Sequence, residues 1–104
     1  MKRGEIWRAD LGYAGKVRPV LILSVAYTDD ERAIVTYIPR TTRSWPKSRF
    51  DVPHRSRLMK DGAFAVQLIG SIPGAKFHHR IGPIDASTLR EVESALCTWL
   101  DLDA

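Results

Sequence analysis

The sequence predicts a mainly β fold, a small and strongly bent barrel with one C-terminal helix packed across it. Short apolar runs separated by turn residues fill most of the chain before Asp85. After Asp85 the apolar period becomes that of a helix, and strands do not alternate with helices earlier in the chain. A length of 104 residues and a hydrophobic content of 44% suit one folded domain spanning residues 1–104.

Two different apolar patterns predict the first two strands. Trp7, Ala9 and Leu11 recur at period two, which indicates a half-buried strand that ends at the turn "GYAG". Residues 17–24 are apolar enough to indicate a second strand covered on both faces. Trp7 is therefore expected in the core.

The later elements follow from the same reading. A β-branched run at residues 33–39 predicts a third strand, and further strands are expected at "FDVP", "GAFAVQLIGSI" and "AKFHHRIG", with a short turn at Leu58 and Met59. The terminal helix has one apolar stripe, which places Trp99 in the core, and Asp85 is its expected N-cap. The stripe consists of Leu89, Val92, Leu96 and Trp99.

The charges are distributed unevenly. Residues 85–104 hold five acids and one base, whereas residues 1–84 hold 15 bases and seven acids. Within that basic body, residues 40–60 combine seven bases and one acid with Trp45 and Phe50. Bases for phosphates and rings for stacking favour binding of single-stranded RNA. The alternative is a solvated basic loop.

Other features limit the class of protein. No apolar stretch approaches the length of a membrane helix, and "MKRGEIW" is not followed by a signal-peptide apolar region, so a cytoplasmic protein without a membrane partner is expected. The lone Cys97 is interpreted as a small buried residue of the helix, with a nucleophile as the alternative.

Arg18 stands before Pro19 at the entrance of the second predicted strand. Proline biases the residue before it toward extended backbone, so the Arg18 guanidinium is held in place and loses less entropy on clamping a phosphate. The alternative is an ion pair between Arg18 and Asp10 or Glu5 at the barrel end.

The histidines allow a rival acid–base scheme. His78 and His79 are consecutive, so on a strand they point to opposite faces and cannot both reach one phosphate. His54 lies in the basic segment and could combine with either of them. The alternative is that all three are surface or rim residues.

Several motifs in series resemble one known family. The stretches are "RGEIWRADLG", "RPVLILS", "IPRTT", "DGAFAVQLIGSI" and the terminal helix. Together they look like the MazF/PemK (Kid) family of type II toxin endoribonucleases, over nearly the whole chain. The resemblance implies an SH3-like barrel of the CcdB/MazF type, usually a homodimer. It also implies cleavage of single-stranded RNA without a metal or other cofactor, and inhibition by an acidic antitoxin.

The resemblance also implies a site. Arg18 of "RPV" and Thr41 of "P-x-T" match the family's catalytic pair. The implied reaction is attack of a ribose 2′-OH on the adjacent phosphorus, which leaves a 2′,3′-cyclic phosphate. Because arginine stays protonated, we assign Arg18 to electrostatic stabilisation. The expected RNA contacts are Lys16, Arg40, Thr42, Arg43, Trp45, Lys47 and Arg49.

Some alternatives stay open. Thr41 and Thr42 could simply end a strand, and Trp45 could stack a base, anchor an antitoxin peptide or be structural. Only "YAGKV" separates "DLG" from "RPV", shorter than in many relatives, and Gln67 lacks the charged neighbours common in the family. A CcdB-like poison of DNA gyrase and an inactive SH3-like RNA- or peptide-binding module are the other functions considered.

Overall fold

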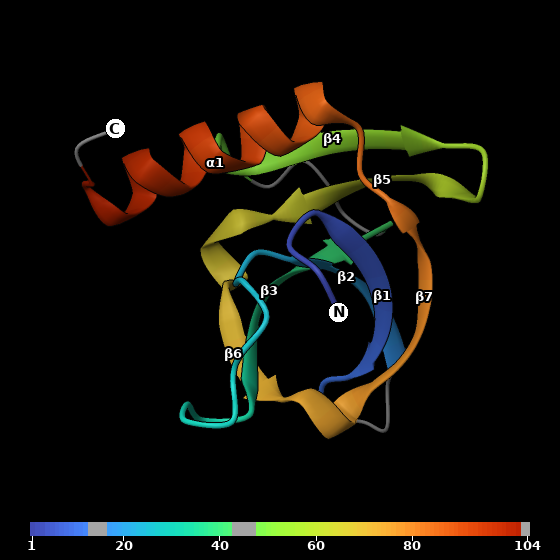
Figure 1. Cartoon of the computed structure of the whole chain (residues 1–104). Helices are drawn as coiled ribbons and strands as arrows, with labels where there is room; N and C mark the ends of the chain where they lie inside the picture. The colour runs from blue at the N-terminus through green and yellow to red at the C-terminus, as the bar shows by residue number, and fades with distance from the viewer. Residues whose placement is uncertain (13–16, 43–47, 103–104) are drawn as a thin grey trace.

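A seven-stranded antiparallel sheet curls on itself in the computed structural model, which describes residues 1–12, 17–42 and 48–102. The strand order is β4-β5-β3-β2-β1-β7, and β6 pairs with β3 beside this path. The helix α1 packs against β4 and the 3-10 turn at Val66–Leu68 (Figure 1). The elements are β1 (Glu5–Asp10), β2 (Val17–Ile22), β3 (Ile34–Thr41), β4 (Asp51–Ser56), β5 (Met59–Ala65), β6 (Gly70–Pro73), β7 (Phe77–Pro83) and α1 (Ala86–Leu100), with 3-10 turns at Val66–Leu68 and Gly74–Lys76. The predicted series of strands followed by a terminal helix is confirmed, but the expected strand "GAFAVQLIGSI" is divided by the 3-10 turn at Val66–Leu68 into the end of β5 and the start of β6.

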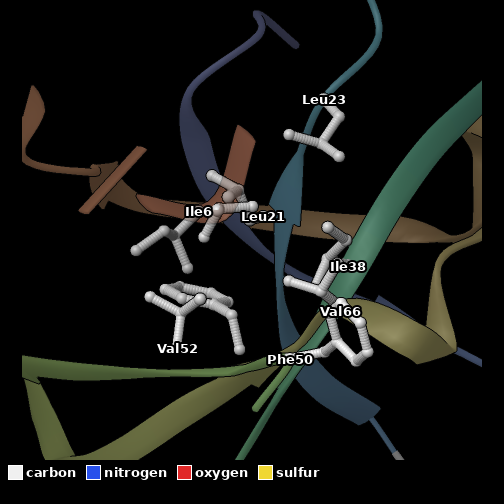
Figure 2. Close-up of a cluster of buried hydrophobic side chains, with 9 residues drawn as sticks. Ile6, Leu21, Leu23, Ile38, Phe50, Val52 and Val66 are labelled. Atoms are coloured by element: carbon white, nitrogen blue, oxygen red, sulfur yellow. The ribbon is translucent and has the colours of Figure 1, made fainter. Parts of the chain in front are cut away.

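Strands β1 to β3 bury side chains on both faces. One face contributes to the helix-side cluster, which consists of Ile6, Leu21, Leu23, Ile38, Phe50, Val52, Phe64, Val66 and Val92 (Figure 2). The opposite cluster consists of Ala9, Leu11, Val20, Ile22, Val35, Tyr37 and Phe77. Successive β2 residues thus enter different clusters, as the prediction of a doubly covered strand requires. β2 ends at Ile22 and not at Ser24, because the amides of Leu23 and Ser24 both donate to the Thr36 carbonyl.

Strand β3 changes its partner along its length. Its first half pairs with β6, and residues Tyr37, Ile38 and Pro39 pair with β2. Its last two residues, Arg40 and Thr41, pair with β5 instead. One strand therefore joins the main sheet to the β4–β5 hairpin, and β2 and β3 part after Pro39.

The helix begins where the sequence predicted. The Asp85 carboxylate accepts a hydrogen bond from the Thr88 amide at 2.9 Å and one from the Thr88 hydroxyl at 2.7 Å. The helix ends at Asp101, whose φ of 55° places it in the left-handed region. Val92 is fully buried in the helix-side cluster, so the predicted stripe does face the core.

Three side chains differ from their expected burial. Trp99 is 43% exposed, because it lies in the last helical turn, where it packs against the Phe50 ring with the centroids 5.2 Å apart. Trp7 is half-buried, and its indole N–H donates to Glu5. Cys97 is also half-buried. Within the described part of the chain, no helix is long and apolar enough to span a membrane.

Candidate active site

Arg18 lies near the start of β2, opposite Ala9 of β1. It is half-buried, and Pro19 follows it in the strand. The two carboxylates considered as partners are occupied elsewhere: Glu5 pairs with Arg80 at 2.5 Å, and Asp10 accepts from the Gly12 amide. Among residues 1–12, 17–42 and 48–102, Arg18 has no carboxylate within ion-pair distance. The structural alternative for Arg18 is thus not supported.

Thr41 is the last residue of β3 and pairs with Ala63 of β5. The pairing of β2 with β3 fixes which face Thr41 shares with Arg18. Val20 lies opposite Pro39, and Arg18 and Thr41 each lie two residues further toward the same end of the two strands. Since side chains alternate at period two, Arg18 and Thr41 share one face. They stand on either side of the place where β2 and β3 part.

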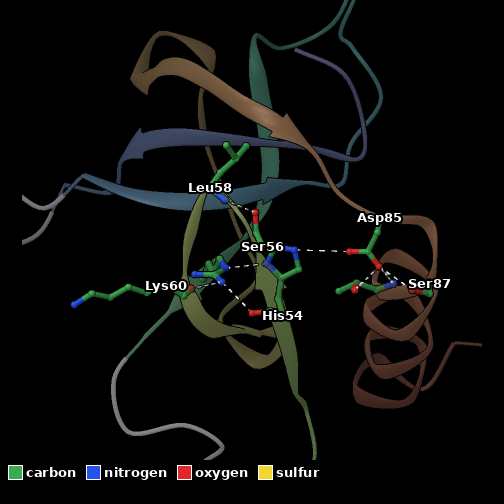
Figure 3. A network of polar contacts seen from close by, with 8 residues as sticks. His54, Ser56, Leu58, Lys60, Asp85 and Ser87 are labelled. Atoms are coloured by element: carbon green, nitrogen blue, oxygen red, sulfur yellow. Dashed lines mark hydrogen bonds and ion pairs between the residues drawn. The ribbon is translucent and has the colours of Figure 1, made fainter.

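Arg40 is a correction to the expected RNA surface. It is only 3% exposed, and its guanidinium is engaged inside the domain. Nε donates to His54 Nδ1 at 2.9 Å, and Nη2 donates to the carbonyl oxygens of His54 at 3.0 Å and Lys60 at 2.6 Å (Figure 3). Burial lowers the pKa of Arg40, and the charge of Asp61 opposes that shift. Arg40 is buried and not on the RNA surface because side chains alternate along β3, so Arg40 points inward and its neighbour Thr41 points to the other face.

His54 is buried as well, with 5% of its surface exposed, so it is neither a surface nor a rim residue. Because its Nδ1 accepts from Arg40, the imidazole is neutral and its proton is on Nε2. Nε2 faces Asp85 Oδ1 at 3.7 Å (Figure 3). Burial and the Arg40 charge lower the pKa of His54, and the Asp85 charge opposes them. A buried imidazole whose Nδ1 accepts from Arg40 does not suit proton transfer to RNA.

The other two histidines are placed differently. His78 and His79 are exposed on β7, with His79 opposite Arg8 of β1. The pairing of β1 with β7 shifts register here, with Arg8 opposite His79 and Ala9 opposite Phe77, so the expected alternation of His78 and His79 does not follow from the strand period. His54 does not meet them, because it is enclosed between the hairpin and the helix N-terminus. His54 therefore does not form an acid–base pair with either of them.

The remaining expected RNA contacts divide into two groups. Thr42 and Arg49 are exposed, and the Arg49 guanidinium lies 4.7 Å from the centre of the Phe50 ring. Lys16, Arg43, Trp45 and Lys47 lie outside the described residues. The β4–β5 hairpin presents further exposed bases that the site prediction omitted, and these are Arg55, Arg57 and Lys60.

The Arg40–His54–Asp85 network could not be read from the sequence. Its only sequence signals are an arginine at the end of a β-branched run and a histidine in a short strand, and neither specifies the other. As for metals, no three His, Cys, Asp or Glu side chains come together as a ligand group within the part of the chain described.

Comparison with known proteins places this geometry in a family. Residues 2–100 match the PemK-like, MazF-like toxin of type II toxin-antitoxin systems. Among solved structures, the Mycobacterium tuberculosis toxin MazF-mt6 is 27% identical, with a TM-score of 0.80 over 96% of this chain and 99% of that one. MazF from Deinococcus radiodurans is 20% identical, with a TM-score of 0.84 over 98% of this chain and 97% of that one.

A third structure was solved as a complex. It is an endoribonuclease from a Mycobacterial species together with its cognate antitoxin, 24% identical, with a TM-score of 0.80 over 100% of this chain and 96% of that one. The barrel type implied by the sequence motifs is therefore confirmed. The chain belongs to the PemK-like, MazF-like family of toxins of type II toxin-antitoxin systems.

Proposed function

We propose that this toxin is a metal-independent, sequence-specific endoribonuclease of single-stranded RNA, an mRNA interferase that acts in the cytoplasm. The observation that carries the proposal is the placement of Arg18 and Thr41 on one face, where β2 and β3 part. The exposed bases Arg49, Arg55, Arg57 and Lys60 support a polyanionic substrate.

The reaction is an in-line displacement at phosphorus. The ribose 2′-oxygen loses its proton and forms a bond to phosphorus, the bond from phosphorus to the 5′-oxygen breaks, and the 5′-oxygen takes up a proton, so that a 2′,3′-cyclic phosphate and a 5′-hydroxyl result. Negative charge builds up on the nonbridging oxygens, where the Arg18 guanidinium and the Thr41 hydroxyl or amide stabilise it as hydrogen-bond donors. Pro19 keeps Arg18 in extended backbone, so little reorganisation accompanies binding.

Exposed residues of the basic segment hold the RNA in this proposal. Arg49 offers a guanidinium to a phosphate, and Thr42 offers a hydroxyl directly after Thr41. Lys16, Arg43, Trp45 and Lys47 belong to this proposal on the evidence of the sequence alone. Trp45 would stack a base, which adds binding energy with little sequence preference.

The partner proposed is a small acidic antitoxin whose disordered tail folds onto the basic face. Residues 1–84 carry 15 bases against seven acids, which suits such a tail. The printed description of the Mycobacterial relative, in complex with its cognate antitoxin, supports this type of partner. We further propose that the toxin is a homodimer.

The test is incubation of the purified protein with a long unstructured RNA in EDTA, followed by mapping of the ends. Arg18→Ala is compared with Arg90→Ala, a matched change at an exposed position of α1. Cleavage in EDTA that leaves cyclic phosphate ends, persists in Arg90→Ala and is lost in Arg18→Ala is the expected result. Intact RNA with folded wild-type protein would contradict the proposal and favour a gyrase poison or a binding module.

A further inference from the structure

The side chain of Arg40 joins three strands. It projects from β3 into the interior and donates hydrogen bonds to atoms of β4 and β5. Its partners are the His54 ring and the carbonyl oxygens of His54 and Lys60. No buried side-chain nitrogen or oxygen of the described residues is left without a hydrogen bond, so the buried groups of this network are paired. Paired buried groups are held in one geometry.

Thr41 depends on the same part of β3. Only Arg40 and Thr41 pair with β5, because β3 has left β2 after Pro39. Two residue pairs are a short ladder for a strand end. The Arg40 side chain adds charge-assisted hydrogen bonds across this junction, one residue before Thr41.

Gly62 shows how closely the junction is packed. A Cβ on Gly62 would lie 2.5 Å from the Thr41 carbonyl oxygen and 2.8 Å from Arg40 Nη1. The backbone of β5 thus touches both residues at once, so a movement of the Arg40 guanidinium is transmitted to Thr41. His54 in turn faces Asp85, the N-cap of α1, which closes the network against the helix.

We propose that Arg40 is a positioning residue which, through His54 and the β4–β5 hairpin, sets the place of Thr41 opposite Arg18. The inference deepens the proposed ribonuclease function and rests on it. Arg40 does not contact RNA in this scheme, because it is buried and its Nε and Nη2 donate to atoms of β4 and β5. Its contribution therefore appears in the turnover step and not in substrate binding.

The experiment uses three variants of the full-length protein. Arg40→Met removes the donors, Arg40→Lys keeps the charge without the planar fork, and the double variant Arg40→Met with His54→Leu replaces the buried pair by apolar side chains. Arg90→Met on the exposed side of α1 is the control. Cleavage of a defined RNA is followed at several salt concentrations, well below the unfolding temperature of each variant.

A positioning role predicts a specific pattern. We expect kcat to fall about 10- to 100-fold in both single variants, as misplacement of a reacting group by about 1 Å would cause. KM and its salt dependence should stay near those of the wild type. The double variant should regain part of the thermal stability lost in Arg40→Met, because the imidazole left without a hydrogen-bond donor is removed as well. Its kcat should nevertheless remain low.

Three results would overturn the inference. One is a wild-type kcat in Arg40→Met, and another is recovery of kcat together with stability in the double variant, which would mark a purely structural pair. The third is a raised KM with a shallower salt dependence, which would mark a direct RNA contact.

A separate measurement distinguishes a failure of this inference from a failure of the proposed function. Nuclear Overhauser contacts between Thr41 and Ala63, which pair across β3 and β5, are compared between Arg40→Met and Arg90→Met by NMR without RNA. If the wild type cleaves no RNA, the ribonuclease proposal fails, and loss of these contacts in Arg40→Met alone would still support the positioning of Thr41. Unchanged contacts would overturn the positioning, whatever the activity.

Discussion

Gly62 of β5 lies directly against Thr41 of β3, and an added Cβ would be 2.5 Å from the Thr41 carbonyl oxygen. Real Cβ atoms do not approach backbone oxygens so closely, so any larger residue must displace one of the two strands. Thr41, the proposed catalytic threonine, can therefore keep its present position only if residue 62 is glycine.

Gly62→Ala should therefore reduce cleavage more than it reduces stability. We expect a loss of about 1–3 kcal/mol in the free energy of unfolding from overpacking, and a fall in kcat of about 10- to 100-fold from the displaced Thr41. Urea unfolding and single-turnover cleavage measure the two effects. Gly82→Ala is the control, because its Cβ would meet only Leu58 Cδ1, at 3.4 Å. Equal kcat in both variants would contradict the prediction.

The stability of the protein should fall on mild acidification because of His54. Burial and the charge of Arg40 lower the pKa of His54 below its ordinary value of 6.5, against the opposing charge of Asp85. The unfolded chain then binds more protons, so stability is full above pH 6.5, falls as the pH drops below 6.5 and levels off below the folded pKa. Urea unfolding between pH 8 and pH 5 measures this slope.

His54→Leu provides the control for that slope. The variant should be less stable at every pH, because Arg40 Nε loses its acceptor, but its stability should vary less between pH 8 and pH 5. Glu5 and Asp85 do not contribute to the pH dependence of stability between pH 8 and pH 5. The amide of Lys2 lowers the pKa of Glu5 to about 2 and Thr88 lowers that of Asp85 to about 2, so their contributions to stability are lost only as the pH falls from 4.5 and 3.8, respectively, through about 2. An unchanged slope would exclude His54 as its source.

Asp85→Ala should weaken the start of α1. Loss of the N-cap acceptor for Thr88 costs about 1 kcal/mol in the free energy of unfolding, and the variant should lose the part of the acid-induced destabilisation that follows from protonation of Asp85. Asp85→Asn keeps an acceptor without the charge and should retain most of the stability. Thermal unfolding of the two variants at pH 7 makes the comparison, and equal losses would show that the charge and not the cap is important.

Arg49→Gln should change the salt dependence of RNA binding. Arg49 is exposed beside the Phe50 ring, and a contact to one phosphate of a single strand contributes about 0.7 to the slope of log K against log salt. We expect the slope to fall by about that amount, with the same loss for every RNA sequence. Fluorescence anisotropy with Arg18→Ala protein, which does not cut the RNA, measures it. A slope equal to that of Arg90→Gln would remove Arg49 from the RNA surface.

Much of the fold could be predicted from local patterns. The run around Val20 and Leu21 indicated a strand covered on both faces, and Asp85 was the expected cap of a helix whose Val92 is buried. The errors concern the ends of these patterns. Trp99 continues the helical stripe but lies in the last turn, where the sheet offers little beyond Phe50 to cover it.

The candidate site was predicted less completely, for a reason visible in one pair. Arg18 and Thr41 could be named from their motifs, but Arg40 was assigned to the RNA surface by its charge alone. Its actual acceptor, His54, lies 14 residues further along the chain. Residue type shows that an arginine needs acceptors, but not whether water, a phosphate or a buried imidazole supplies them.

The sequence by itself determined the strands, the helix and its cap, the basic body and the Arg18–Pro19 entrance of β2. Each of these follows from residue type and spacing within a few residues, where backbone sterics and side-chain period act directly. Only the tertiary structure decided that β3 leaves β2 after Pro39, that Arg40 turns inward and that Thr41 shares a face with Arg18. Those facts depend on which strands pair and in which register, and register is set by the packing of the whole barrel.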